Sequence, residues 1–218
     1  MSPAAPASAP WPEFKRPLVA ILRGVRPDEV LPIGNALVEA GFEAIEVPLN
    51  SPQPFDSIAL LAKHLPSGVL VGAGTVLDAA DVTAVHDAGG RLIVSPNFDP
   101  AVLRRAGELA MVTLPGVFSP SEALGALRAG ASALKFFPAN ALGASGIGAI
   151  AAILPRGAVF GAVGGVSDQD FPAYLRAGAR LFGLGSSLYK PGSTAAEVAE
   201  RGGRAVAAYD AAAAGLAQ

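Results

Sequence analysis

Short apolar runs of the kind that form buried strands alternate along the chain with Ala- and Leu-rich segments whose apolar residues recur at helical spacing. The runs return roughly every 20 to 26 residues, which suits a unit of one strand, one helix and short connections. Continuous apolar runs are typical of parallel strands that helices cover. Eight strands are predicted, over residues 18–24, 44–50, 70–76, 92–97, 111–116, 133–139, 158–165 and 181–187.

The segments between these runs contain start and stop signals of helices. Ser119 and Glu122 have the spacing of a capping box, and the Ala-rich segment after Thr194 is expected to form the eighth helix. Acidic residues also open several helices, namely Asp28, Asp81 and Asp168. Four helices are predicted to end in a left-handed glycine that follows alanine, at Gly41, Gly89, Gly130 and Gly178.

Eight strand-helix units predict an α/β protein that folds as a single (β/α)8 TIM barrel over residues 17–218. An open, doubly wound parallel sheet is the alternative. The Pro- and Ala-rich residues 1–16 are expected to be a flexible N-terminal tail, and they lack the charged start and apolar centre of a signal peptide.

Composition narrows the classes of partner and ligand. A chain of 218 residues with 51% hydrophobic content can bury one large core. The formal charge of -2, without a Lys- or Arg-rich stretch, gives no sign of a nucleic-acid or anionic membrane partner, so a small ligand is expected. The apolar segment 141–154 is too short to span a bilayer, and the protein is expected to be cytoplasmic.

Three charged residues lie inside the predicted strands, and all three fall toward the carboxyl-terminal half, where barrels of this type place their active sites. They are Arg23, Glu46 and Lys135. Glu46 and Lys135 lie on the second and sixth strands, and even-numbered strands contribute to the same inner layers of a barrel. Both side chains are therefore expected to point into one cavity.

The chemistry of a buried lysine beside a buried carboxylate suggests a Schiff-base mechanism. Burial lowers the pKa of an amine and raises the pKa of a carboxyl group. Lys135 could then act as a neutral nucleophile, and Glu46 could transfer protons near neutral pH. The alternative is a structural ion pair, although such a pair often stabilises a fold less than an apolar replacement does.

Glycine-bearing segments end the seventh and eighth strands, with Gly164 and Gly165 in the first and Gly185 and Ser186 in the second. Loops at these positions of a barrel commonly bind phosphate through backbone N–H groups. The alternative is that the glycines only allow the chain to turn. No metal site is expected, because the chain has no cysteine, and His64 and His86 have no partner cluster.

A set of motifs in a fixed order resembles the KDPG/KHG family of class I aldolases. These motifs are IEVPLN at 45–50, VGAGTV at 71–76, IVSPN at 93–97, LPG at 114–116, LKFFP at 134–138 and GGVS at 164–167. The opening LRG at 22–24 and the run through Asn50 most resemble the members that act on 2-dehydro-3-deoxy-6-phosphogalactonate. The resemblance implies reversible cleavage to pyruvate and D-glyceraldehyde 3-phosphate, no metal or other cofactor, and a homotrimer.

The resemblance also implies roles for individual residues. Lys135 forms the imine and Glu46 transfers protons. Arg23 and Thr75 hold the substrate carboxylate, with Arg23 supplying the cation that relatives acting on the gluconate compound have at the position of Asn50. The remaining expected contacts are Pro96, Phe137 and Val163 around the carbon chain, and Gly164, Gly165, Gly185 and Ser186 at the phosphate.

Other functions remain open at this stage. Within the family, the substrate could be 2-dehydro-3-deoxy-6-phosphogluconate or 4-hydroxy-2-oxoglutarate. A sugar-phosphate epimerase or isomerase could use the same scaffold, although it would need paired acid and base groups or a metal rather than a strand lysine. A protein that binds a sugar phosphate without turning it over is the alternative from another class.

Overall fold

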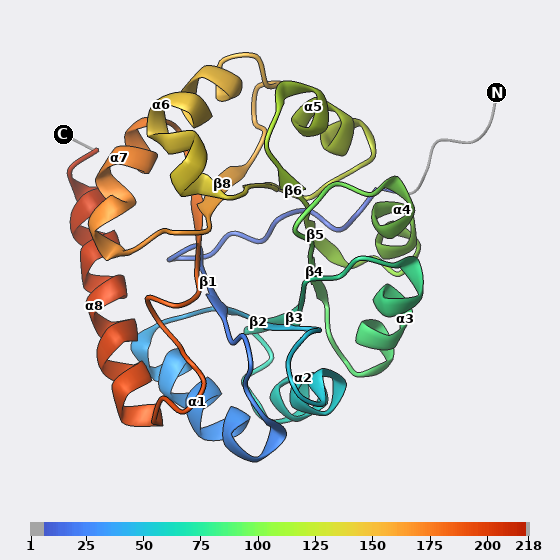
Figure 1. Cartoon of the computed structure of the whole chain (residues 1–218), viewed down its shortest axis with the longest axis vertical. Helices are drawn as coiled ribbons and strands as arrows, with labels where there is room; N and C mark the ends of the chain where they lie inside the picture. The colour runs from blue at the N-terminus through green and yellow to red at the C-terminus, as the bar shows by residue number, and fades with distance from the viewer. Residues whose placement is uncertain (1–6, 217–218) are drawn as a thin grey trace.

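The computed structural model describes residues 7–216, in which parallel strands form a barrel that helices surround (Figure 1). Each strand pairs in parallel with its neighbours, and Glu46, for example, lies opposite Ile21 on one side and Gly72 on the other. The strands within the described residues are β1 (Leu18–Ile21), β2 (Ala44–Pro48), β3 (Leu70–Gly74), β4 (Leu92–Val94), β5 (Val112–Leu114), β6 (Gly116–Val117), β7 (Leu134–Phe136), β8 (Phe160–Val163) and β9 (Leu181–Leu184).

The fifth strand of the barrel is interrupted, and its two halves pair with different neighbours. β5 pairs with β4 and β6 pairs with β7, so the two short strands are the halves of the single strand expected over 111–116. Pro115 separates them, and proline has no backbone N–H to donate to a neighbouring strand. The prediction of a barrel of strand-helix units is confirmed, with this interruption as a local difference.

The helices follow the strands around the outside of the barrel (Figure 1). The Ser119–Glu122 capping box is present, and Thr194 caps the last helix. The described residues form α1 (Pro27–Ala40), α2 (Pro54–His64), α3 (Ala79–Asp87), α4 (Pro100–Glu108), α5 (Pro120–Arg128), α6 (Ala139–Ala151), α7 (Phe171–Arg176) and α8 (Ala195–Ala214), with a 3-10 turn at Asp168–Asp170. The four expected left-handed glycines have φ angles of 105°, 89°, 85° and 97° at Gly41, Gly89, Gly130 and Gly178. None of the helices in the described range is long and apolar enough to cross a membrane.

Successive side chains of each strand point to opposite faces of the sheet, so the apolar side chains form two separate regions. On β2, Ile45 and Val47 pack in the larger cluster, between strands and helices, whereas Ala44 packs in a smaller cluster. The smaller cluster joins residues of several strands, including Val19, Leu92 and Leu181, and therefore fills the barrel interior. Glu46 shares the inward parity of Ala44, two residues further along the same strand.

The same alternation applies to β7. Leu134 and Phe136 face the helices, and Ala133 lies in the interior cluster. Lys135 therefore points inward, one step above Ala133 toward the carboxyl end of the strand. The barrel interior thus has an apolar lower layer and a charged layer above it.

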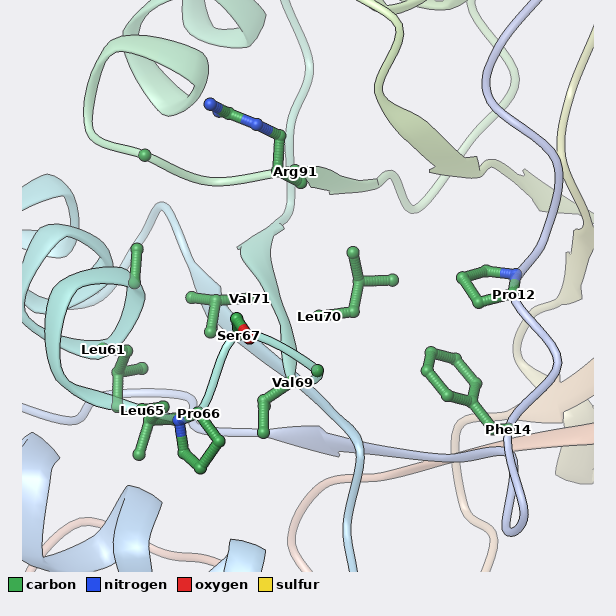
Figure 2. A pocket seen from close by; sticks show the side chains of 13 residues that line it. Pro12, Phe14, Leu61, Leu65, Pro66, Ser67, Val69, Leu70, Val71 and Arg91 are labelled. Carbon is green, nitrogen blue, oxygen red and sulfur yellow. The ribbon is translucent and has the colours of Figure 1, made fainter.

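The N-terminal segment crosses the amino-terminal end of the barrel (Figure 1). Ala9 forms a parallel bridge with Val112, and Trp11 and Phe14 pack against the interior cluster with their rings in an edge-to-face arrangement at 5.8 Å. Figure 2 shows Phe14 and Leu70 among the side chains that line a cavity at this end. The cavity has a volume of about 280 Å³. Residues 7–16 thus differ from the expected flexible tail, because they cover apolar surface that the barrel would otherwise expose. Residues 1–6 of that segment lie outside the described residues.

Candidate active site

A second cavity of about 360 Å³ opens at the carboxyl-terminal ends of the strands. This volume is within the usual range for small-molecule sites. Its walls come from β1, β2, β7, β8 and β9 and from the loops that follow them. The cavity is lined by Ile21, Arg23, Glu46, Thr75, Lys135, Phe137, Val163, Gly164, Gly165, Val166, Gly183, Gly185, Ser186, Tyr189, Lys190 and Pro191.

This cavity brings together all but one of the residues that the sequence singled out. Pro96 is the exception, because it is absent from the lining. It follows β4, where its carbonyl oxygen lies close to Gly116, and a Cβ atom added at Gly116 would be 2.1 Å from that oxygen. The backbone of Pro96 thus packs closely against Gly116 at the start of β6.

Lys135 and Glu46 are the buried charged groups of the cavity, with 6% and 2% of their surfaces exposed. Within residues 7–216, no carboxylate oxygen lies within 4.0 Å of the Lys135 amine, so the two are not a contact ion pair. The amine lies 4.6 Å from the centroid of the Phe137 ring, and Glu46 Oε2 has no hydrogen-bond partner among the residues that the structure describes. An unpartnered buried carboxylate oxygen costs free energy, and functional sites are where such a cost is commonly retained.

Gly74 provides the space for the Glu46 carboxyl group. A Cβ atom at position 74 would lie 1.7 Å from Glu46 Oε2, far inside contact distance. The glycine at the end of β3 is therefore required for Glu46 to hold its observed position, which explains the second glycine of the GAGT motif.

Burial shifts the pKa values of both groups toward neutrality. Desolvation raises the pKa of Glu46 to about 7, while the positive charges of Lys135 and Arg23 oppose that rise. Desolvation lowers the pKa of Lys135 to about 8, the Glu46 charge opposes the decrease, and Arg23 adds to it. At neutral pH the site can therefore supply both a neutral amine and a carboxyl group able to accept or donate a proton.

Arg23 projects from the end of β1 and is held by two polar neighbours. Its Nη1 donates a hydrogen bond of 2.7 Å to Asn50 Oδ1, and its Nη2 donates one of 3.4 Å to Thr75 Oγ1. Thr75 has a φ of 58°, a left-handed conformation that is uncommon for a β-branched residue. Asn50 thus orients the Arg23 side chain, a role that the sequence did not predict for it.

The loop after β8 presents two left-handed glycines beside Val163. Gly164 and Gly165 have φ angles of 91° and 70°. A Cβ atom at Gly165 would lie 2.5 Å from the Asn140 side chain, so the backbone approaches its neighbours closely here. Val163 itself is buried, and its methyl groups occupy space left by Gly183 on β9.

Part of the cavity lining is not predicted by the sequence motifs, chiefly the loop between β9 and α8. Ile21, Tyr189, Lys190 and Pro191 line the cavity without having been predicted to do so. A sequence signal did exist for Lys190, since it follows the glycines that end the eighth strand by only a few residues. The path of an irregular loop, however, cannot be derived from such spacing.

No group of three or more His, Cys, Asp or Glu side chains in residues 7–216 is arranged to hold a metal ion. The observed groups instead permit nucleophilic catalysis through an amine, with proton transfer by a carboxyl group and a cation near the mouth of the site.

Comparison with known proteins agrees with this chemistry. Residues 14–201 match the family model described as KDPG and KHG aldolase. The chain is 57% identical over 202 residues to a probable 2-dehydro-3-deoxy-6-phosphogalactonate aldolase of Rhizobium meliloti, covering 93% of this chain and 95% of the relative. It is 43% identical over 197 residues to the 2-dehydro-3-deoxy-6-phosphogalactonate aldolase of Escherichia coli K12, covering 90% and 96%.

A solved structure described as native KDPGal superimposes with a TM-score of 0.91 at 42% identity, covering 94% of this chain and 99% of that one. Both the family model and these relatives span nearly the whole barrel and the cavity at its carboxyl-terminal end. The chain belongs to the KDPG and KHG aldolase family.

Proposed function

We propose that this protein reversibly cleaves 2-dehydro-3-deoxy-6-phosphogalactonate to pyruvate and D-glyceraldehyde 3-phosphate through an imine on Lys135. The observation that supports the reaction type most strongly is the desolvated Lys135 amine in the same cavity as the unpartnered Glu46 carboxyl group. The choice of substrate is supported by the names of the two relatives that match over almost the full chain.

In the first step, the neutral amine of Lys135 attacks the C2 carbonyl carbon of the substrate. Loss of water then leaves a positively charged iminium, and Glu46 donates the proton that the departing hydroxyl group needs. The iminium withdraws electrons from C3, which prepares the neighbouring bond for cleavage.

In the second step, Glu46 accepts the proton of the C4 hydroxyl group, directly or through a water. The C3–C4 bond breaks, its electron pair moves to the iminium to form an enamine, and the aldehyde leaves. Glu46 then returns a proton to C3, and hydrolysis of the imine releases pyruvate and restores Lys135. A carboxyl group with a pKa near 7 suits both transfers.

The polar residues around the cavity hold the two ends of the substrate in this proposal. Arg23 and Thr75 bind the carboxylate, since an arginine can bind both oxygens of such a group. Phe137 and Val163 line the carbon chain, with Pro96 outside the cavity wall. The backbone of Gly164, Gly165 and Gly185 and the hydroxyl of Ser186 receive the phosphate at the rim.

Borohydride trapping tests this function directly. Pyruvate plus borohydride is expected to give a reduced adduct on Lys135, located by peptide mass spectrometry, and Lys135→Met is expected to lose both the adduct and all cleavage. An adduct on Lys15 or Lys63, both exposed, would refute the assignment. Binding of the sugar-acid phosphate without turnover would indicate a non-catalytic binding protein instead.

We further propose that residues 17–218 form the catalytic domain of a cytoplasmic homotrimer. The apolar side chains of Leu77 and Phe118, 48% and 46% exposed at the carboxyl-terminal side of the barrel, support burial between copies of the chain. Light scattering of the purified protein is expected to give three times the chain mass, and a monomer at micromolar concentration would refute the assembly.

A further inference from the structure

The loop that joins β9 to α8 places an additional cation at the mouth of the active-site cavity. Lys190 lines the cavity and is solvent-exposed, and within residues 7–216 no carboxylate lies within 4.0 Å of its ammonium nitrogen. It is a charged group at a binding site with no structural partner, so a role in stabilising the fold does not account for it.

The loop that bears Lys190 is fixed on both sides of that residue. Tyr189 is buried and donates a hydrogen bond of 3.0 Å to Glu29 Oε1 on α1. Pro191 sits against Gly24, where a Cβ atom would lie 2.8 Å from the proline ring. Arg201 of α8 donates a hydrogen bond of 3.0 Å to Ser193 Oγ. These contacts hold the backbone of Lys190 at the rim and leave its side chain free to meet a ligand.

The positively charged side chains of the cavity indicate which negatively charged group of the ligand still lacks a partner. Of the cations that line it, Arg23 is hydrogen-bonded to Asn50 and Thr75 and is assigned to the substrate carboxylate in the proposed mechanism, and Lys135 must be neutral to react. Lys190 is the remaining positively charged side chain of the cavity, and it has no assigned role. It lies on the same loop as Gly185 and Ser186, which offer polar groups but no positive charge. A phosphate dianion bound there would be neutralised by no other side chain of the cavity.

We propose that Lys190 binds the phosphate group of the substrate and of the aldehyde product, and so makes the enzyme prefer phosphorylated substrates; this inference rests on the proposed function. Lysine is suited to the task because its compact ammonium group is a point charge that tolerates movement of the phosphate. Pyruvate has no phosphate, so reactions of pyruvate alone do not depend on Lys190.

The kinetic test compares Lys190→Gln with the wild type on the 6-phosphate and on the unphosphorylated sugar acid. For the phosphorylated substrate, KM is expected to rise about tenfold, the usual order for loss of one partly exposed charge-assisted contact. For the unphosphorylated substrate, kcat/KM is expected to change less than about twofold. Lys190→Arg is expected to restore most of the affinity, and Lys63→Gln, at an exposed lysine on α2, is the matched control.

Two further measurements separate this inference from the proposed function. Pyruvate trapping on Lys135 is expected to be the same in Lys190→Gln, which also shows that the variant folds. Binding of inorganic phosphate by calorimetry is expected to weaken in Lys190→Gln and not in Lys63→Gln, whether or not the wild type cleaves the proposed substrate. Equal effects on both substrates, or phosphate binding unchanged by Lys190→Gln, would overturn the role of Lys190; failure of trapping in the wild type would overturn the aldolase mechanism.

Discussion

At the scale of single residues, the chemistry of the site depends on how burial changes the pKa values of two oppositely charged side chains, Glu46 and Lys135. Glu46 and Lys135 lie in one cavity without a contact ion pair, so each is destabilised in its charged form by desolvation and only partly compensated by the other. A close ion pair would hold the amine protonated and unreactive. In the proposed mechanism, their separation and the space that Gly74 provides allow proton transfer near neutral pH.

Replacing Glu46 by glutamine removes the proton carrier and keeps the shape of the side chain. Turnover is expected to fall by about two to four orders of magnitude, while trapping of pyruvate on Lys135 persists at a reduced rate. Steady-state cleavage and borohydride trapping, measured on the same preparation, give the turnover number and the rate of imine trapping. Glu39→Gln, on the exposed face of α1, is the matched control, and wild-type turnover in Glu46→Gln would contradict the proposed proton transfers.

The pH dependence of imine formation is a separate prediction. Because the nucleophile is the neutral amine, the trapping rate should rise with pH through the pKa of Lys135, which is about 8. The Glu46 carboxylate raises that pKa, so Glu46→Gln is expected to lower it and to move the midpoint of the profile to a lower pH. Initial rates with pyruvate and cyanoborohydride across neutral and alkaline pH give the midpoint, and a shift to higher pH would contradict the coupling.

Val163 lines the cavity beside Gly164, and we expect its side chain to influence which epimer of the substrate is preferred. Valine lines the cavity without a hydroxyl group, so the galactonate epimer is expected to be preferred. Val163→Thr adds a donor and should move the ratio of kcat/KM toward the gluconate epimer several-fold, as one net hydrogen bond of about 0.5 to 1.5 kcal/mol allows. Val163→Ala, which adds no donor, controls for a change of volume. A ratio that Val163→Thr leaves unchanged would remove Val163 from specificity.

At the scale of elements, the sequence predicted what depends on local chemistry. The four Ala-Gly helix ends and the Ser119 capping box are present because each signal acts within one turn of its own helix. The inward direction of Glu46 and Lys135 was also predictable, since strand parity fixes it. The break at Pro115 was not, because a proline within a predicted strand allows either a continuing edge or an interruption.

The rim of the site was less predictable for a related reason. Lys190 and Tyr189 belong to an irregular loop whose path depends on distant partners, such as Glu29 on α1. Pro96 differs in another way, because it matches a motif position of the family but is not among the residues that line the cavity. Loop geometry is a tertiary property, and one sequence gives no measure of it.

The contribution of residues 7–16, which cross the amino-terminal end of the barrel, to stability can be tested separately. Phe14→Ala removes an aromatic contact with Trp11 and with the lower layer of the barrel, and is expected to lower the free energy of unfolding by about 1 to 3 kcal/mol. Because this segment lies at the end opposite the active site, kcat/KM should change less than about twofold. Urea unfolding and steady-state kinetics provide the measurements. Ile153→Ala, at an exposed apolar residue, is expected to leave stability unchanged.

At the scale of the whole molecule, closure of the barrel explains why residues 7–16 pack against it although their composition alone predicts a tail. Pro- and Ala-rich residues resemble a tail when their composition alone is considered. Only a closed ring of strands creates an open apolar end, formed by residues such as Val19, Leu92 and Leu181 that are far apart in the chain. Trp11 and Phe14 cover that end, and Arg16 ties the segment to Asp210 on α8 through a hydrogen bond of 2.8 Å.

The pairing of β1 with both β2 and β9 also imposes an order on folding during synthesis. The first strand emerges from the ribosome early, yet one of its two edges finds a partner only when residues 181–184 have been made. Until then the nascent chain exposes an unpaired strand edge, the kind of surface at which chains associate wrongly. The last strand, β9, follows Lys135 by more than 40 residues, and only its synthesis completes the pairing of β1.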